Sequence, residues 1–160
     1  MEEKWLKVLS RLQAQCVRRE YCVRDIRAKA LKAVEGDAAL AEEMVASLVA
    51  DRFVDDRRYA EAFAREKASL SGWGATKIAY ALSGKGIARE TIRDALDQLD
   101  TGAASRKMES VLAAKCRLLA QDPQGKLKLL RFALSRGYGY DEVREVVDRL
   151  WAAARASEEG

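Results

Sequence analysis

The stretch AYALSGKGIARETIRDALDQL, Ala79 to Leu99, reappears as LRFALSRGYGYDEVREVVDRL, Leu130 to Leu150, without a gap at a shift of 51 residues. Apolar residues fall on apolar residues at helical spacing, as when Ile92 matches Val143. Because self-similarity at a fixed period is typical of repeat proteins, this match predicts stacked copies of one helical unit.

The first third of the chain fits the same pattern more loosely. Ile26 matches Ile78, and Leu48 matches Leu99, once one residue is absorbed in the turn around Glu35 to Asp37. Each unit reads as a long first helix, a second helix that ends at glycine and a third helix that starts with small or acidic residues. We therefore predict an all-α fold of three tandem three-helix repeats. The predicted repeats are 1–52, 53–101 and 102–154, and a short flexible tail follows at 155–160.

Two equivalent glycines, Gly86 and Gly137, lie where the second helices of their repeats must reverse direction. Glycine takes the left-handed conformation of such a turn without steric cost, so these residues are predicted to end the second helices.

Adjacent carboxylates at Asp55 and Asp56 raise the question of a catalytic pair. They stand between one repeat and the aromatic positions of the next, Tyr59 and Phe63, where an aspartate can accept hydrogen bonds from unpaired backbone N–H groups. Neighbouring side chains at a helix start also point about 100° apart, which suits no shared ligand. We predict helix capping.

Composition limits the chemistry that the chain can perform. The sequence has no histidine, so the usual Ser/His and Cys/His nucleophile systems are excluded. Cys16, Cys22 and Cys116 are an odd set without CxxC spacing, which supports neither a disulfide framework nor a zinc site. We expect no enzyme activity, no metal and no cofactor. A small metal-dependent hydrolase using acidic residues is the least favoured class.

The hydropathy of the sequence and the pattern of its first residues indicate where in the cell the protein is located. No run approaches the roughly eighteen consecutive apolar residues of a membrane span, and MEEKWLKVLSRL is amphipathic without the apolar core of a signal peptide. We expect a cytoplasmic monomer that does not contact membranes.

A phosphate loop is absent, because Gly84-Lys85 is followed by glycine and no strand precedes it. A dinucleotide-binding fingerprint is also absent, because Gly72-Trp73-Gly74 followed by Lys77 lacks the third glycine. A helix-turn-helix over 75–99 has suitable lengths, but its second helix carries Glu90, Asp94 and Asp97, which phosphates would repel.

Basic residues gather on the predicted second helices, away from the apolar stripes. Lys77 matches Lys128, and Lys85 matches Arg136, at the shift of 51 residues. We predict that stacking aligns these cations in one stripe that follows a polyanion or an acidic groove without reading sequence. This group, called the basic set below, consists of Arg24, Arg27, Lys32, Lys77, Lys85, Lys126, Lys128, Arg131 and Arg136.

The run FVDDRRYAEAFAREKASLSGWGATKIAYALSGKGIARETIRDAL resembles the RecX family of regulatory proteins, as do VRREYCVRDIRAKAL and LLRFALSRGYGYDEVREVV more weakly. The resemblance covers about Val17 to Leu150. Cys22 stands where the family usually has serine, and Ala30 where it usually has leucine. The matching positions are Asp55, Asp56, Arg58, Tyr59, Ala60, Gly74, Ile78, Lys85, Gly86 and Ile87.

The resemblance implies that the three three-helix repeats form an elongated, curved array. It also implies a bacterial regulator of the recombinase RecA without catalytic activity of its own. It implies that the repeats lodge in the groove of the RecA filament on single-stranded DNA and restrain filament growth and strand exchange. We expect lower ATP hydrolysis and strand exchange by RecA as a result. The alternative is a sequence-independent single-stranded nucleic-acid-binding module that acts without RecA.

Overall fold

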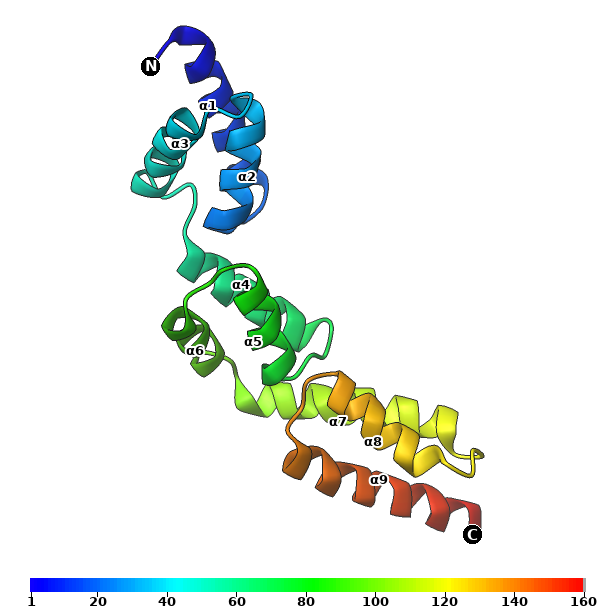
Figure 1. Ribbon diagram of the computed structural model, residues 1–160. Helices are drawn as coiled ribbons and strands as arrows, with labels where there is room; N and C mark the ends of the chain where they lie inside the picture. The colour runs from blue at the N-terminus through cyan, green and yellow to red at the C-terminus, as the bar shows by residue number, and fades with distance from the viewer. Residues whose placement is uncertain (160) are drawn as a thin grey trace. The chain divides into compact units, whose positions relative to one another are not determined.

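The computed structural model describes residues 1–159, which form nine helices and no strand (Figure 1). The helices are α1 (Glu3–Arg18), α2 (Val23–Ala33), α3 (Ala38–Ala50), α4 (Asp56–Ser69), α5 (Ala75–Gly84), α6 (Arg89–Asp97), α7 (Thr101–Leu119), α8 (Gly125–Ser135) and α9 (Tyr140–Glu159). The all-α fold and the three groups of three helices are confirmed. The elongated, curved array and the exact repeat boundaries stay predictions.

Packing divides the described residues into two compact units. One unit contains residues 1–62 and 82–95, and the other contains residues 63–81 and those from 96 onward. The first unit therefore holds the first repeat with part of the second, and the other unit holds the rest of the second repeat with the third.

The core of the first repeat forms on one face of α1. Leu9, Leu12 and Cys16 are buried there at helical spacing and pack with residues of α2 and α3. Ala30 is fully buried in this core, so the residue that departs from the family pattern remains a packing position.

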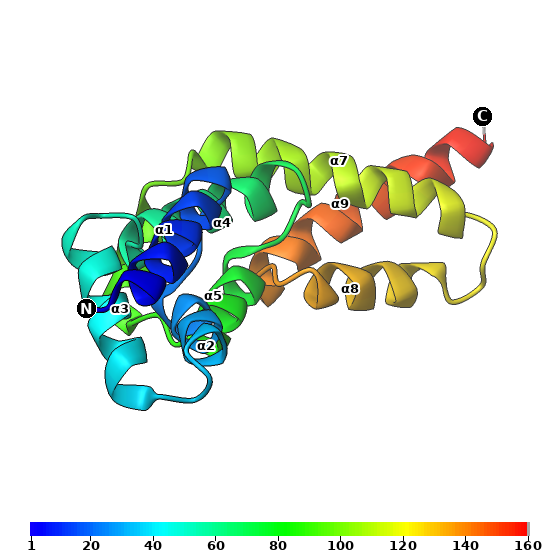
Figure 2. The same ribbon diagram turned by 90° about the horizontal axis from the view of Figure 1, so that it is seen from above.

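The core of the third repeat repeats this arrangement. Met108, Leu112 and Cys116 form the buried stripe of α7, which packs with α8 and α9. These three helices lie side by side in Figures 1 and 2. A buried stripe along the long first helix therefore occurs in both outer repeats.

Left-handed residues follow each second helix, as predicted for Gly86 and Gly137, whose φ angles are 78° and 89°. In the first repeat the equivalent turn uses Glu35, with φ 59°, followed by Gly36 with φ 88°. A Cβ atom makes this conformation costly, so Glu35 carries backbone strain that glycine avoids at the other two turns.

Asp55 caps α4 and thereby confirms the structural interpretation of this residue. Its Oδ1 accepts hydrogen bonds from the backbone N–H groups of Arg57 at 2.9 Å and Arg58 at 3.1 Å. These donors belong to the first turn of α4, which has no earlier carbonyl to pair with them.

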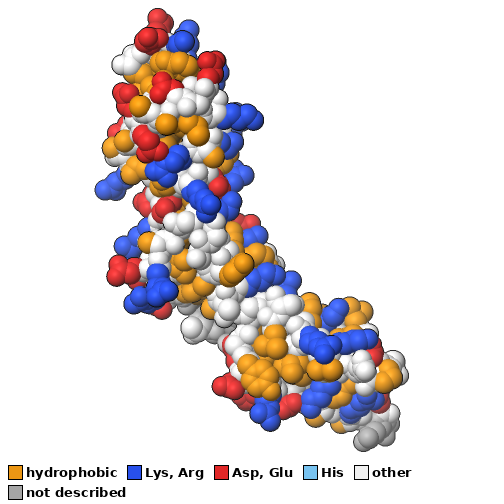
Figure 3. Space-filling view, in the orientation of Figure 1, with side chains coloured by type: hydrophobic (Ala, Val, Ile, Leu, Met, Phe, Trp, Pro, Cys, Tyr) orange, Lys and Arg blue, Asp and Glu red, His pale blue; other side chains and the backbone are white. Residues whose placement is uncertain are grey.

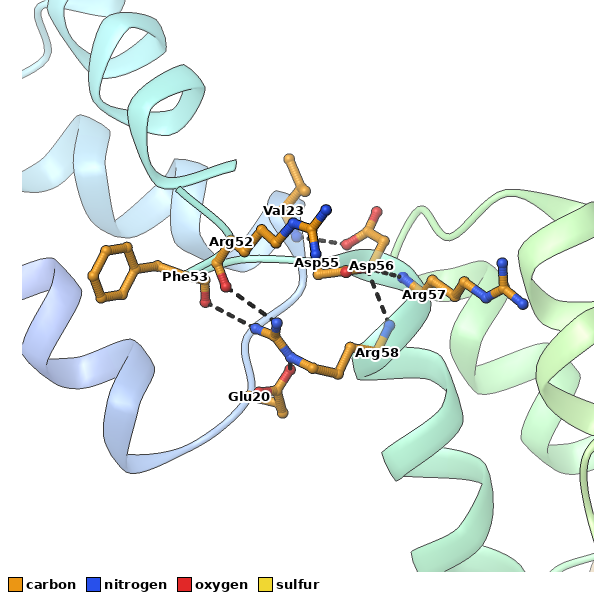
Figure 4. A network of polar contacts seen from close by, with 8 residues as sticks. All are labelled: Glu20, Val23, Arg52, Phe53, Asp55, Asp56, Arg57 and Arg58. Atoms are coloured by element: carbon orange, nitrogen blue, oxygen red, sulfur yellow. Dashed lines mark hydrogen bonds and ion pairs between the residues drawn. The ribbon is translucent and has the colours of Figure 1, made fainter. Parts of the chain in front are cut away.

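Asp56 caps a different helix. Its Oδ1 accepts a 2.8 Å hydrogen bond from the N–H of Val23, the first residue of α2 (Figure 4). The N-cap residue of α2, Cys22, makes no side-chain cap of its own. One carboxylate of the second repeat therefore supplies the cap that the first repeat lacks.

Arg58 contacts two loop segments that lie beside this cap (Figure 4). Its Nε lies 2.8 Å from Oε2 of Glu20, and its Nη atoms donate to the carbonyls of Arg52 and Phe53 at 3.1 and 3.3 Å. The guanidinium thus joins the α1–α2 loop to the α3–α4 loop.

In the other unit, the end of α8 meets the start of α5 through the backbone. The carbonyls of Arg136 and Gly137 accept hydrogen bonds from the N–H groups of Gly74 at 2.7 Å and Thr76 at 3.1 Å. A Cβ atom on Gly74 would lie 2.3 Å from the Gly137 oxygen, and one on Gly137 would lie 2.3 Å from Cβ of Lys77. The contact requires glycine at both positions.

The predicted tail at 155–160 is helical up to Glu159, and Gly160 lies outside the described residues. The helix continues because Ala154 packs against the third core and Gln121, in the segment between α7 and α8, donates a 2.8 Å hydrogen bond to Glu158. Residue 154 is therefore not the end of α9.

Replacing Glu35 with glycine should stabilise the protein. Relief of the left-handed strain outweighs the extra chain entropy of glycine, and we expect a gain of about 0.5–1 kcal/mol in the free energy of unfolding. Thermal denaturation followed by circular dichroism measures it. Gly86→Ala is the matched control, which should lower the melting temperature; a lower melting temperature for Glu35→Gly would contradict this prediction.

Replacing Asp56 with alanine should remove the cap of α2 and destabilise the protein by about 1 kcal/mol. Asp56→Asn keeps an acceptor oxygen, so it should lose less. Urea denaturation of both variants checks this prediction, and equal losses for the two would show that the hydrogen bond to Val23 contributes nothing.

Candidate functional site

Residues 1–159 contain no group of three or more histidine, cysteine, aspartate or glutamate side chains that could hold a metal ion. None of their helices combines the length and apolar character needed to cross a bilayer. The candidate site is therefore the basic set, whose members the structure places individually.

Three members lie on α2. Arg24 donates from Nη1 to the carbonyl of Gly84 at 2.7 Å, and Arg27 forms a 2.6 Å ion pair with Glu42 of α3. Lys32 is exposed and makes no hydrogen bond or ion pair with any part of the chain that the structure describes. Of these three cations, Lys32 is the one fully available to a partner.

Lys85 holds the first and second repeats together. Its Nζ lies 2.9 Å from Oδ2 of Asp25 on α2. Burial raises the pKa of Asp25, but the hydrogen bond and charge of Lys85 outweigh burial, and the pKa is lowered overall. The hydrogen bond to Asp25 likewise raises the pKa of Lys85, which burial opposes. Each group therefore favours the charged form of the other.

Arg136 has the equivalent position in the third repeat and likewise contacts the preceding repeat. Its Nη2 donates to the carbonyl of Ser71, which precedes α5, while its Nε is buried without a partner among the described residues. Beside it, the hydroxyl of Tyr138 donates to the carbonyl of Gly72. Lys85 and Arg136 thus both reach from the end of a second helix into the preceding repeat.

Lys77 lies in an aromatic cluster. Its Nζ is 4.4 Å from the centre of the Trp73 ring, which Lys67 also approaches at 4.9 Å. Phe63 meets Trp73 edge-on, with ring centres 6.2 Å apart. Such cation–π contacts hold a lysine side chain against its own protein and leave its charge able to attract an anion.

The remaining members lie on α8, which carries no acidic residue. Lys126 forms a 2.9 Å ion pair with Asp148, and Lys128 forms a 2.5 Å pair with Asp122. Both lysine side chains are still about half exposed, at 53% and 50%. Arg131 is exposed and has neither an ion pair nor a hydrogen bond within residues 1–159. Figure 3 shows basic side chains over α8 and over α2.

The structure thus brings four members together in one unit, Arg24, Arg27, Lys32 and Lys85, and five in the other. Their alignment in one stripe across both units stays a prediction. The acidic partners could not be predicted from the sequence pattern, since Asp25, for example, is 60 residues from Lys85 in the chain.

Three cations of α1 are not members of the predicted basic set. Lys4, Lys7 and Arg11 line a groove of about 490 Å³ beside Trp5, with Glu3 and Glu35 also in its wall. Their spacing of three and four residues on the polar side of α1 is the signal that could have found them.

The three cysteines are buried and unbridged. Burial raises the pKa of the Cys16, Cys22 and Cys116 thiols and is the largest cause of the shift in each case. A thiol with a raised pKa is a poor nucleophile at neutral pH, so these residues are core thiols, as expected.

The Lys85–Asp25 pair should contribute its full stability between about pH 4 and pH 10. Because the folded pKa of Asp25 is depressed, its share is lost as the pH falls through that pKa. The folded pKa of Lys85 is raised, so its share is lost as the pH rises through that value. We expect Lys85→Met to cost about 0.5 kcal/mol at pH 7 and less at pH 3.

Urea denaturation at both pH values measures this difference, with Lys32→Met as the unpaired control. A cost for Lys85→Met that is the same at pH 3 and pH 7 would show that the ion pair is not its source.

Comparisons with known proteins give the family. The model of the second three-helix domain of RecX matches residues 55–96, which begin just before α4 and end within α6. Regulatory protein RecX of Clostridium botulinum (strain Eklund 17B / Type B) is 36% identical over 101 residues, which cover 59% of this chain and 46% of that relative. This chain spans about half the length of the first Clostridium relatives that it matches.

Solved structures share the fold. A crystal structure of regulatory protein RecX superposes with a TM-score of 0.79 at 21% identity, over 89% of this chain and 71% of that one. RecX from Lactobacillus salivarius gives a TM-score of 0.73 at 20% identity, over 89% and 96%. Regulatory protein RecX of Herbaspirillum seropedicae is 30% identical over 119 residues, which cover 74% of each chain. This chain therefore belongs to the RecX family.

Proposed function

We propose that the protein binds the RecA nucleoprotein filament on single-stranded DNA and regulates it, mainly by inhibiting ATP hydrolysis and strand exchange by RecA. The relatives are named regulatory proteins, which supports a regulatory role for this chain. The proposal takes the cations of the second helices as the contact with the filament.

The observation that carries this proposal is the charge of α8. Three cations and no acid lie on this helix, and Arg131 among them is exposed and unpaired within the described chain. Lys32 provides the same kind of free cation on α2. Cations that are not already neutralised gain most from a polyanion, because no internal ion pair must break first.

Lys126 and Lys128 can also supply positive charge to a partner. Their pairs with Asp148 and Asp122 are half exposed, and exposed ion pairs contribute little free energy. A phosphate or a carboxylate of a partner can therefore replace the internal acid at small cost. Lys85 and Arg136, by contrast, hold repeats together and are poor candidates for exchange.

A single-stranded nucleic-acid-binding module that acts without RecA is the second candidate. Tyr80 on α5 is 83% exposed, and it lies one turn after Lys77, which stacks on Trp73. An exposed aromatic ring beside cations can stack an unpaired base without reading its identity.

Reversing the free cations tests the proposal. The double variant Lys32→Glu/Arg131→Glu should need about tenfold more protein for half-inhibition of the single-stranded-DNA-dependent ATPase of RecA, because two favourable ionic contacts become repulsive. Arg93→Glu on α6, also an exposed arginine, is the matched control and should inhibit normally. Circular dichroism confirms that each variant folds.

Full inhibition by the double variant would remove these cations from the mechanism. Fluorescence anisotropy with labelled oligo(dT), with and without RecA, separates the two candidate functions. Tight binding to bare oligo(dT), with no additional complex when RecA filaments are supplied, would favour the second candidate over the first.

A further inference from the structure

The helix α8 has a second apolar face that the core does not use. Leu129 and Ala133 point into the core and are fully buried. Leu127 and Leu134, in contrast, are 45% and 40% exposed, and Leu130 lies between them partly buried. The spacing of i, i+3 and i+7 places these three leucines along one side of the helix.

A groove runs beside this leucine face, between α8 and α9. Pro123, Leu127 and Leu130 form one side of it, and Val147 of α9 contributes to the other. Its volume of about 440 Å³ falls within the roughly 300–1,000 Å³ of ligand-binding clefts. All its lining residues belong to one compact unit, so the groove is a property of the third repeat alone.

The rim of the groove is positive. Lys126 and Arg144 line it, and the acid at the rim, Asp148, is already paired with Lys126 at 2.9 Å. Arg144 is exposed and has no ion pair or hydrogen bond in the described part of the chain. Arg131, four residues after Leu127, borders the leucine face and is equally unpaired. Basic and apolar side chains adjoin over this part of the surface in Figure 3.

We propose that this groove, defined by Leu127, Leu130, Val147 and the flanking Arg131 and Arg144, docks an acidic amphipathic helix of a protein partner. Apolar residues of that helix would bury against the leucine face at matching i, i+3 and i+7 positions, and its carboxylates would pair with the arginines. The docking rests on the third repeat and does not require RecA to be the partner.

Nucleic acid fits this groove less well. The groove lining contains no aromatic side chain on which a base could stack, and burying leucine against sugar and phosphate gains little. The two unpaired arginines also stand beside apolar surface rather than along a polar track. The combination therefore favours a partner that is apolar on one side and acidic on the other.

A synthetic peptide tests the docking with the intact chain and without RecA or DNA. The probe is a fluorescein-labelled helix of about 18 residues, five turns long, with leucine at every third and fourth position and glutamate elsewhere. We expect saturable binding in fluorescence anisotropy. The double variant Leu127→Ser/Leu134→Ser should bind about tenfold more weakly, because exposed leucine surface no longer becomes buried.

Two controls separate docking from general stickiness. Leu118→Ser removes a leucine of α7 that is 80% exposed and should leave the affinity unchanged. A peptide with lysine in place of glutamate should not bind, because it would meet Arg131 and Arg144. Since all three leucines replaced are exposed, folding should survive, and circular dichroism verifies it.

Three results would overturn the proposal. They are no binding of the acidic peptide, equal binding of the basic peptide, and a dimer in analytical ultracentrifugation that Leu127→Ser/Leu134→Ser abolishes. The last result would assign the groove to a second copy of this chain. A failure of RecA inhibition leaves all three readouts untouched, so the two proposals fall or stand separately.

Discussion

The contact between helix ends in successive repeats is the constraint on which the rest of the structure depends. A helix start has N–H groups without partners, and a helix end has carbonyls without partners. At the start of α5 the carbonyls of Arg136 and Gly137 satisfy the N–H groups of Gly74 and Thr76. Glycine at 74 and 137 permits this approach, since a Cβ at either position would overlap its neighbour.

The first and second repeats meet with side chains in the same roles. Asp56 accepts from the N–H of Val23, Arg24 donates to the carbonyl of Gly84, and Lys85 pairs with Asp25. Backbone groups of one junction are thus replaced by charged side chains in the other. The side-chain junction should respond to pH, whereas the backbone junction should not. These junctions also limit which cations are available to partners, because Lys85 pairs with Asp25 and Arg136 donates to the carbonyl of Ser71.

Much of the fold could be predicted because its determinants are local or periodic. The shift of 51 residues fixes the repeats, the left-handed turns follow from Gly86 and Gly137, and Asp55 caps the helix that it precedes. The partner of Asp56 could not be predicted, since it lies 33 residues away and depends on how repeats stack. The same holds for the ion pairs of the basic set, whose acids lie on other helices or loops. At the last helix, packing of Ala154 on the core extends α9 beyond the expected end of the repeat.

Amide hydrogen exchange at Gly74 and Thr76, followed by NMR, tests the junction most directly. The account predicts that both amides exchange as slowly as amides within α5, and that Gly137→Ala removes this protection because its Cβ would displace Lys77. Exchange of both amides at the rate of a solvent-exposed loop in the unmodified protein would contradict it.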